Sequence, residues 1–350
     1  ITHVHDHCSN TQNLEIRKIL LFCKYILIIH TVHPDTEQTF LYHKMFILGG
    51  NRTYALQLLE QTYYQGKVVI VTGGNTGIGF ETAKDLAERG ARVYIACRSE
   101  SRGTTARDQI ANASGNQDIH YRHLDLASLV SVRTFADEFI KTEKCLDILI
   151  NNAGVFESEY VITEDGLLFA MQTNHFGPFL LTNLLLPLLK SSAPSRIINV
   201  SSLSYKTGEI DFNNLNMEKE TKSSFNFLKA YGNSKLCNIL MTIKLKRRLE
   251  GAGVTTNSLH PGLVYTSILD RNERAWIQYF YAPIAKKFSK TAWEGAQTTV
   301  YLAVSPEVNG ISGCYFDNCK MVKPSKAARD TEVAKKLWEV SEKLVGLQNS

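Results

Sequence analysis

The arrangement of apolar residues from Gly66 onward is the feature of this 350-residue chain that most restricts its fold. Short β-branched and aliphatic runs, apolar on both faces, alternate with longer segments of helical periodicity. Such strands, connected by helices, form parallel sheets that are covered on two sides. The pattern therefore predicts a doubly wound α/β domain with helices on both faces. The predicted strands begin at Lys67, Arg92, Asp118, Leu146, Arg196 and Val254, and a strand near residues 313–316 completes a mainly parallel seven-stranded sheet.

Composition separates the first part of the chain from this pattern. The first of the 22 glycines is Gly49, and six of the ten histidines lie at or before His43. We therefore predict a single catalytic domain over residues 64–347 and an N-terminal extension over residues 1–63. The apolar run from Ile16 to Val32 is interrupted by Lys24, so it is marginal for a spanning helix. The extension is either a membrane-associating segment or a leader foreign to the native protein.

Charge and cysteine usage exclude several functional classes. The net charge is +5 and no run of five or more basic residues occurs, so nucleic-acid binding is not expected. The seven cysteines contain no C-x-x-C pair, which argues against a disulfide framework and a zinc site. The tract from His3 to Cys8 lacks a second ligand cluster, so we predict no metal site. This cysteine usage favours an intracellular protein.

A glycine-rich sequence, TGGNTGIG from Thr72 to Gly79, follows the first predicted strand and leads into a helix. Glycines permit a tight turn there, and backbone N–H groups at the helix start can approach a pyrophosphate. We predict a dinucleotide-binding loop, although this motif alone leaves open a glycine-rich turn of another kind. The predicted contacts are Gly73, Asn75, Thr76, Gly77, Ile78 and Gly79.

The residue after the second predicted strand bears on the choice of cofactor. Arg98 stands there instead of the acidic residue that binds a free ribose 2′-hydroxyl. A guanidinium suits a 2′-phosphate, so NADP(H) is expected in preference to NAD(H). Asp125, after the third strand, could accept a hydrogen bond from the adenine amino group. The alternatives are a solvated charge for Arg98 and a helix cap for Asp125.

Further motifs follow in a fixed order: NNAG from Asn151 to Gly154, Asn174, NVSS ending at Ser202, and Tyr231-Gly-Asn-Ser-Lys235. With the glycine-rich loop, they make the chain resemble the short-chain dehydrogenase/reductase family from about Lys67 to Leu347. The longer stretches HLDLAS, LDILINNAGV, TNHFGPFLLTNLLLP, SRIINVSSLS and VTTNSLHPG resemble its retinol dehydrogenase branch. The resemblance implies a Rossmann-type domain with a nicotinamide cofactor.

Tyr231 and Lys235 are four residues apart, which places them on one face of a helix. The ammonium could therefore lower the tyrosine pKa and make the phenol an acid/base near neutral pH. A YxxxK pair by itself is also common on helix surfaces. The resemblance implies that Ser202 holds the substrate oxygen and that Asn174 anchors a proton-relaying water; otherwise these residues are a strand cap and a buried amide. It also implies cofactor contacts from Leu126, Asn152, Ala153, Gly154, Tyr231, Lys235, Pro261, Gly262, Val264 and Thr266.

An aromatic-rich segment with a basic rim, near residues 267–290, is interpreted as a substrate lid. It could cover a long hydrocarbon and contact an anionic membrane surface. The alternative is a helix packed on the core. The uncharged helix around residues 176–189 and the helix after Tyr231 are candidates for a homodimer interface, unless their apolar faces are covered within the chain.

These observations predict an NADP(H)-dependent oxidoreductase that interconverts a lipophilic alcohol and its aldehyde or ketone. By resemblance, the substrate is retinol-like or retinal-like. A steroid or xenobiotic carbonyl reductase stays open, as does a non-catalytic dinucleotide-binding scaffold. The expected location is the endoplasmic reticulum or mitochondrial membrane, otherwise the cytoplasm.

Overall fold

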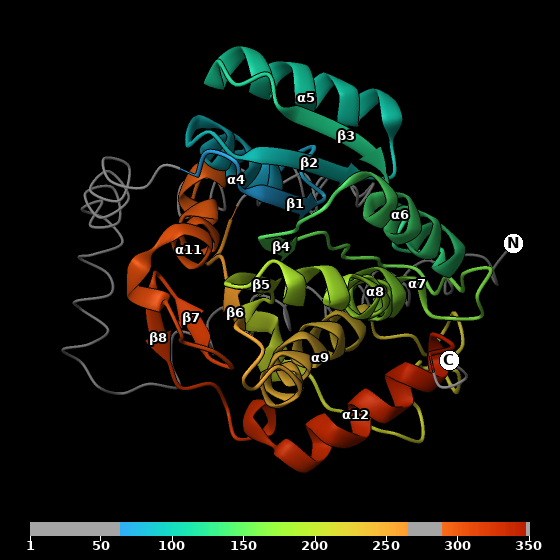
Figure 1. Ribbon diagram of the computed structural model, residues 1–350. Coiled ribbons are helices and arrows are strands. Elements are labelled where there is room, and N and C mark those ends of the chain that lie inside the picture. Colours follow the sequence, from blue (N-terminus) through green and yellow to red (C-terminus); the bar gives the residue numbers. More distant parts are fainter. Residues whose placement is uncertain (1–63, 265–288, 348–350) are drawn as a thin grey trace, which may run out of the picture. The chain divides into compact units, whose positions relative to one another are not determined.

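The structure, a computed structural model, describes residues 64–264 and 289–347. These residues form a sheet of eight strands in the order β3-β2-β1-β4-β5-β6-β7-β8 (Figure 1). All neighbouring strands are parallel except β7 and β8. The strands are β1 (Val68–Thr72), β2 (Arg92–Cys97), β3 (Ile119–His123), β4 (Ile148–Asn151), β5 (Ser195–Val200), β6 (Val254–His260), β7 (Tyr315–Asp317) and β8 (Lys320–Val322).

The predicted fold class is confirmed, with one strand more than the seven predicted. The additional strand, β8, has three residues and returns antiparallel to β7 through a tight turn at Asn318 and Cys319. Two of the three β8 residues are exposed, so its sequence has no buried run to mark it as a strand. Hydrogen bonding to β7 stabilises β8, and local sequence cannot indicate that pairing.

Helices cover both faces of the sheet because alternate residues of each strand point to opposite sides. Val69 and Val71 of β1 belong to the core formed with α4, α5 and α11. Val68 and Ile70 belong to the core formed with α6, α8, α9 and α12. The helices are α4 (Gly77–Glu88), α5 (Glu100–Ser114), α6 (Leu129–Thr142), α7 (Phe169–Met171), α8 (Gly177–Ser191), α9 (Phe227–Arg248), α11 (Ala292–Val304) and α12 (Thr331–Leu344).

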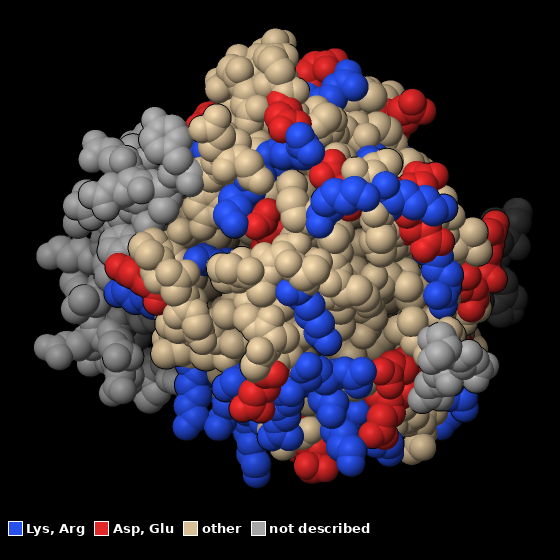
Figure 2. Space-filling view, viewed as in Figure 1, with Lys and Arg blue, Asp and Glu red and all other residues tan. Residues whose placement is uncertain are grey.

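The last helix, α12, packs against α9 and α8. Trp338 is buried, and its ring lies 4.6 Å from that of Phe179 in α8. The Arg248 guanidinium at the end of α9 lies 4.7 Å from the Trp338 ring centroid. Lys and Arg side chains gather at the lower edge of the molecule in Figure 2, on the side of α12 in Figure 1. The chain itself therefore covers apolar surface of α8 and α9 that the sequence offered for a homodimer, and dimer formation stays a prediction.

Several predicted features fall on residues that the structure does not describe. The N-terminal extension, Thr266 and residues 267–288 of the predicted lid are outside the described ranges. Among the residues that are described, no helix is long and apolar enough to cross a membrane.

Candidate active site

A cavity of about 330 Å³ lies at the carboxyl ends of the parallel strands. Beside the cavity, β1 lies between β2 and β4, because β2 and β3 extend the sheet from β1 in one direction and β4 begins its extension in the other. Ligands of doubly wound sheets bind at such a reversal of strand order. The structure brings most of the predicted site residues together in its wall. These are Gly73, Asn75, Thr76, Gly77, Ile78, Gly79, Arg98, Asp125, Leu126, Asn152, Ala153, Gly154, Tyr231, Lys235 and Pro261.

The glycine-rich loop is too closely packed for side chains at its critical positions. A Cβ at Gly79 would lie 2.4 Å from the Gly73 carbonyl oxygen and 2.5 Å from Asn152 Nδ2. Gly73 has a φ of +66°, a conformation that glycine adopts readily. Among the described residues, no side chain caps the start of α4, and its first turn holds no acidic residue. The loop therefore leaves backbone N–H groups for an anion, as a bound dinucleotide requires.

Thr72, which the sequence analysis did not select, holds the β4 loop beside the glycine-rich loop. Its Oγ1 accepts hydrogen bonds from the backbone N–H groups of Asn152 and Ala153, each at 3.0 Å. Asn152 Nδ2 donates to the Thr72 carbonyl oxygen at 2.8 Å. A threonine at the end of a buried strand carries no distinctive signal, because β-branched residues are common there. The contact becomes evident only when β1 and β4 are paired.

Basic side chains line one end of the cavity. Arg98 and Arg102 are both exposed and both belong to its wall. Ser99 caps α5 by accepting a hydrogen bond from the Arg102 N–H at 3.4 Å, which fixes Arg102 one turn after Arg98. Neither guanidinium forms an ion pair within residues 64–264 and 289–347. Arg102 was missed by the sequence analysis, although the Ser99 cap and the four-residue spacing were available to indicate it.

Asp125 lies in the cavity wall and also shapes the turn before α6. Its Oδ1 accepts a hydrogen bond from the Ala127 N–H at 2.9 Å, and its own N–H donates to Ser131 Oγ at 3.0 Å. The side chain thus stabilises the local turn, whereas the cap of α6 is Ser128, so Asp125 is not the helix cap that was its alternative role. Its predicted contact with adenine stays a prediction.

Tyr231 and Lys235 lie on one face of α9 at the other end of the cavity. Lys235 Nζ is 5.5 Å from the centre of the Tyr231 ring and donates to the Val200 carbonyl oxygen at 3.2 Å. Burial lowers the Lys235 pKa to about 8. Gly154 permits this arrangement, because a Cβ there would be 3.1 Å from Nζ.

The Tyr231 pKa differs from the sequence prediction. Burial raises it, and a hydrogen bond with the Ser202 hydroxyl opposes that rise only in part. The prediction of a lowered pKa was wrong for the protein alone, because the Lys235 ammonium is hydrogen-bonded to Val200 and is itself desolvated. Tyr231 is therefore protonated at neutral pH, which is the state needed to donate a proton.

Asn174 lies in a short π-helix, Gln172–Phe176, just before α8. Its side chain accepts a hydrogen bond from the Val155 N–H at 2.7 Å and donates to the Val155 carbonyl oxygen at 2.9 Å. It also donates to Ser234 Oγ at 3.0 Å. The side chain thus satisfies protein neighbours, as the alternative interpretation described, and a water-relaying role stays a prediction.

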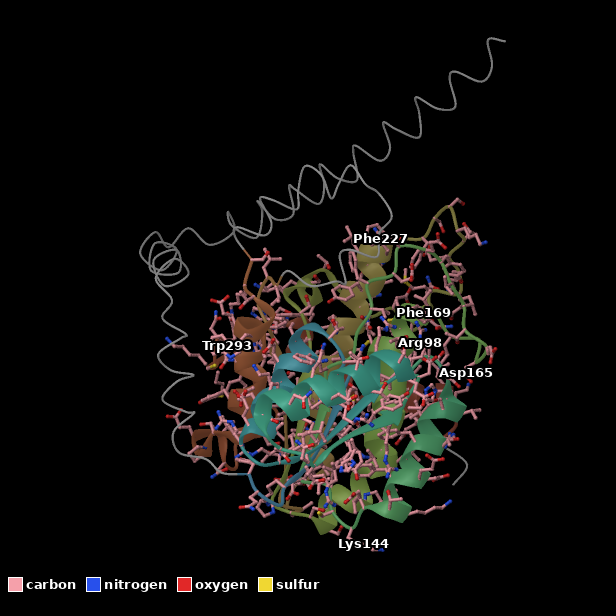
Figure 3. All side chains as sticks on the ribbon, turned by 90° about the horizontal axis from the view of Figure 1, so that it is seen from above. Arg98, Lys144, Asp165, Phe169, Phe227 and Trp293 are labelled. Atoms are coloured by element: carbon pink, nitrogen blue, oxygen red, sulfur yellow. The ribbon has the colours of Figure 1, made fainter. Side chains whose placement is uncertain are left out.

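Aromatic side chains that the sequence analysis did not select surround the tyrosine. The Phe156 ring lies 5.0 Å from the Tyr231 ring and 5.2 Å from the Phe227 ring at the start of α9. Phe156 and Phe169 line the cavity together with Arg98, and Figure 3 labels Phe169 and Arg98. Phe156 and Phe227 are 71 positions apart, so only the fold brings them together.

A glycine-rich loop suited to a dinucleotide lies at one end of the cavity, and a buried, protonated phenol lies at the other. Together they define an oxidoreductase that uses a nicotinamide cofactor. The short chain dehydrogenase family model matches residues 67–214. Human retinol dehydrogenase 14 is 48% identical over 299 residues, covering 81% of this chain and 87% of the relative. The chain belongs to the short-chain dehydrogenase/reductase family, in its retinol dehydrogenase branch.

Other relatives and solved structures agree with this assignment. Mouse retinol dehydrogenase 12 is 40% identical over 330 residues, covering 94% of this chain and 98% of the relative. A Mycobacterium paratuberculosis protein of known crystal structure aligns with a TM-score of 0.66 and 33% identity, over 83% of this chain and 97% of that chain. The complex of Pseudomonas aeruginosa RhlG with NADP aligns with a TM-score of 0.56 and 26% identity, over 73% and 95% of the two chains.

Proposed function

We propose that the protein interconverts a lipophilic alcohol, of the retinol type, and its aldehyde or ketone with NADP(H). The observation that supports this substrate class is the contact of the Phe156 ring with Tyr231. Phe156 also contacts the Phe227 ring. A substrate oxygen that reaches the Tyr231 phenol brings its neighbouring carbons against these rings, and apolar carbon gains most from such burial. The names of the relatives, retinol dehydrogenases 11 to 14, agree with this substrate class.

The chemistry assigned to the protein is proton transfer. A nicotinamide bound in the cavity supplies hydride in reduction and accepts it in oxidation. Tyr231 donates its phenolic proton to the carbonyl oxygen in reduction and takes the alcohol proton in oxidation. Ser202 holds the same oxygen in this proposal, because its hydroxyl is close enough to the Tyr231 phenol to oppose the rise of the phenol pKa. Lys235 carries a positive charge below its pKa of about 8, and its ammonium lies 5.5 Å from the centre of the Tyr231 ring.

The NADP(H) preference is supported by Arg98 and Arg102. Both guanidiniums line the cavity, and neither is neutralised by a carboxylate in the described part of the chain. A 2′-phosphate would supply the anion that they lack, in charge-assisted hydrogen bonds. The remaining proposed cofactor contacts place Asn152, Ala153 and Gly154 at the adenosine ribose. Pro261, Gly262 and Val264 contact the nicotinamide in the same proposal.

Contact with a membrane surface belongs to the same proposal, because lipophilic substrates partition into membranes. We expect the full chain to sediment with liposomes that contain anionic lipid. An intracellular membrane would then supply the substrate. Sedimentation with and without liposomes measures this association.

The function is tested with purified protein by following NADPH absorbance. The panel contains all-trans-retinal, a steroid ketone, an aromatic ketone and a short aldehyde. We expect oxidation of NADPH with all-trans-retinal in the wild type, and loss of turnover with retained NADPH binding in Tyr231→Phe. A neutral ring of the same shape keeps the contact with Phe156 but has no proton to donate.

The outcomes separate the alternatives. Turnover of the steroid or aromatic ketone but not retinal would assign a different carbonyl substrate. Binding of NADPH without turnover of any compound would support the non-catalytic scaffold and overturn the proposal.

A further inference from the structure

The loop that follows β6 is attached to the β7–β8 turn by side chains outside the cavity. Pro261, in this loop, lines the cavity, and Leu263 and Val264 follow it. The β7–β8 turn is formed by Asn318 and Cys319. Two separate sets of contacts connect them.

The first set is made by His260, the last residue of β6. Its Nδ1 accepts a hydrogen bond from the Gly262 N–H at 3.0 Å, so in the neutral ring the proton is on Nε2. His260 Nε2 lies 3.2 Å from Asp317 Oδ1 at the end of β7. His260 is buried, so this bridge is shielded from water. It fixes the start of the loop to the sheet.

The second set is made by Lys290, which crosses the loop. Its Nζ lies 2.5 Å from Asn318 Oδ1 and 3.4 Å from the Pro261 carbonyl oxygen. Its backbone N–H donates to the Leu263 carbonyl oxygen at 2.8 Å. Gly262 makes room for this side chain, because a Cβ there would be 2.9 Å from Nζ. The ammonium therefore lies directly on the loop backbone.

The turn that accepts the ammonium is itself held in place. Asn318 and Cys319 have φ values of +49° and +61°, the left-handed conformation of a two-residue hairpin turn. The Cys319 N–H donates to Thr298 Oγ1 in α11 at 3.2 Å. The acceptor for Lys290 is thus attached both to the sheet and to a helix.

We propose that Lys290 is a positioning residue that sets the loop Pro261–Leu263 at the distance needed to hold the nicotinamide half of the cofactor. This inference rests on the proposed function, which places the nicotinamide against that loop. Lys290 acts through the Pro261 and Leu263 carbonyl groups and does not touch the reacting atoms. The adenosine half, at the Arg98 end of the cavity, is independent of it.

The test compares two ligands in Lys290→Met, which keeps the length of the side chain and removes the ammonium. NADPH contains both halves of the cofactor, whereas adenosine 2′,5′-bisphosphate contains only the adenosine half. We expect the NADPH dissociation constant to rise by about tenfold, while that of the bisphosphate changes by less than about twofold. Turnover should fall with little change in the KM for the carbonyl substrate, and Lys290→Arg should restore most of both quantities.

Lys67→Met is the matched control. Lys67 is also a partly exposed lysine with one strong polar contact, 2.7 Å to Asp147 Oδ1, but it lies just before β1, at the amino ends of the parallel strands and away from the loop. We expect this variant to bind both ligands as the wild type does. Asn318→Gly is the second variant, in case Lys290→Met folds poorly. Glycine adopts the left-handed turn and removes the acceptor of the ammonium, so Asn318→Gly should raise the NADPH dissociation constant as Lys290→Met does.

Equal weakening of both ligands, or unchanged NADPH binding in Lys290→Met and Asn318→Gly, would overturn the inference. A wild type that binds NADPH but reduces no carbonyl compound would reject the proposed function alone. The comparison of the two ligands would still decide whether Lys290 positions the loop.

Discussion

At the scale of single residues, Arg98 and Arg102 lead to a prediction about cofactor choice. Arg98→Asp should raise the dissociation constant of NADPH by about 10- to 100-fold, because a charge-assisted hydrogen bond contributes about 1.5–3 kcal/mol. The NADH value should change little, since NADH has no 2′-phosphate. Titration calorimetry with both cofactors measures the two effects.

Arg107→Asp is the control for that substitution. Arg107 lies on the same helix, α5, but pairs with Asp108 and does not line the cavity. Arg107→Asp makes the same change in charge as Arg98→Asp, and it should leave the dissociation constants of NADPH and NADH near the wild-type values. Equal weakening of NADPH and NADH by Arg98→Asp would contradict the assignment of Arg98 to the 2′-phosphate.

The residues that could be predicted from sequence are those whose geometry is local. The glycine-rich loop lies within one turn, and Tyr231 and Lys235 share a helix face by their spacing alone. Phe156 with Phe227, and Lys290 with Asn318, meet only after the sheet has assembled. The Tyr231 pKa direction was mispredicted for a related reason, because spacing gives no measure of how deeply a pair is buried.

At the scale of elements, the π-helix Gln172–Phe176 buries His175 against α12. His175 Nε2 is 3.0 Å from Ser341 Oγ, and burial lowers the His175 pKa to about 4. The unfolded chain has a histidine pKa of about 6.5. The folded state therefore binds fewer protons between these values, and its stability falls as the pH drops from about 6.5 towards 4.

His175→Gln should remove this contribution, because glutamine does not titrate. The free energy of unfolding of the wild type, relative to the variant, should fall by about 3 kcal/mol between pH 7 and pH 4. Urea denaturation of both proteins at each pH measures the difference. Parallel stability profiles for the two proteins would contradict a neutral, buried His175.

Most strands and helices could be predicted because each carries its own periodic pattern, as in the alternation between the two cores along β1. The π-helix could not, since one extra residue in a helical turn leaves the apolar spacing of Gln172–Phe176 almost unchanged. The strand β8 could not either. Its position depends on the left-handed turn at Asn318 and Cys319, and neither residue is a glycine that would have indicated it.

At the scale of the whole molecule, α12 joins the core on one side of the sheet through Trp338. Trp338→Ala should reduce the free energy of unfolding by about 3–5 kcal/mol, because it removes a fully buried aromatic side chain and leaves a cavity beside Phe179. Chemical denaturation measures the loss. The variant should also self-associate in sedimentation experiments, since α8 and α9 lose part of their cover.

Lys335→Ala, on the exposed side of the same helix, is the matched control. It should change stability by less than about 0.5 kcal/mol and leave the sedimentation coefficient unchanged. A Trp338→Ala protein as stable as this control would show that α12 contributes little to the core.

The exposure of Arg98 and Arg102 has a consequence for how such a protein can diverge. Both side chains are exposed, so if they bind the 2′-phosphate as proposed, substitutions at these two positions would change the cofactor preference at little risk to folding. The residues proposed for proton transfer have no such freedom, because Lys235 and Asn174 are hydrogen-bonded to backbone carbonyls and both lie close to Gly154. Specificity for the electron carrier should therefore drift quickly among descendants of this chain, while the chemistry that it serves stays constant.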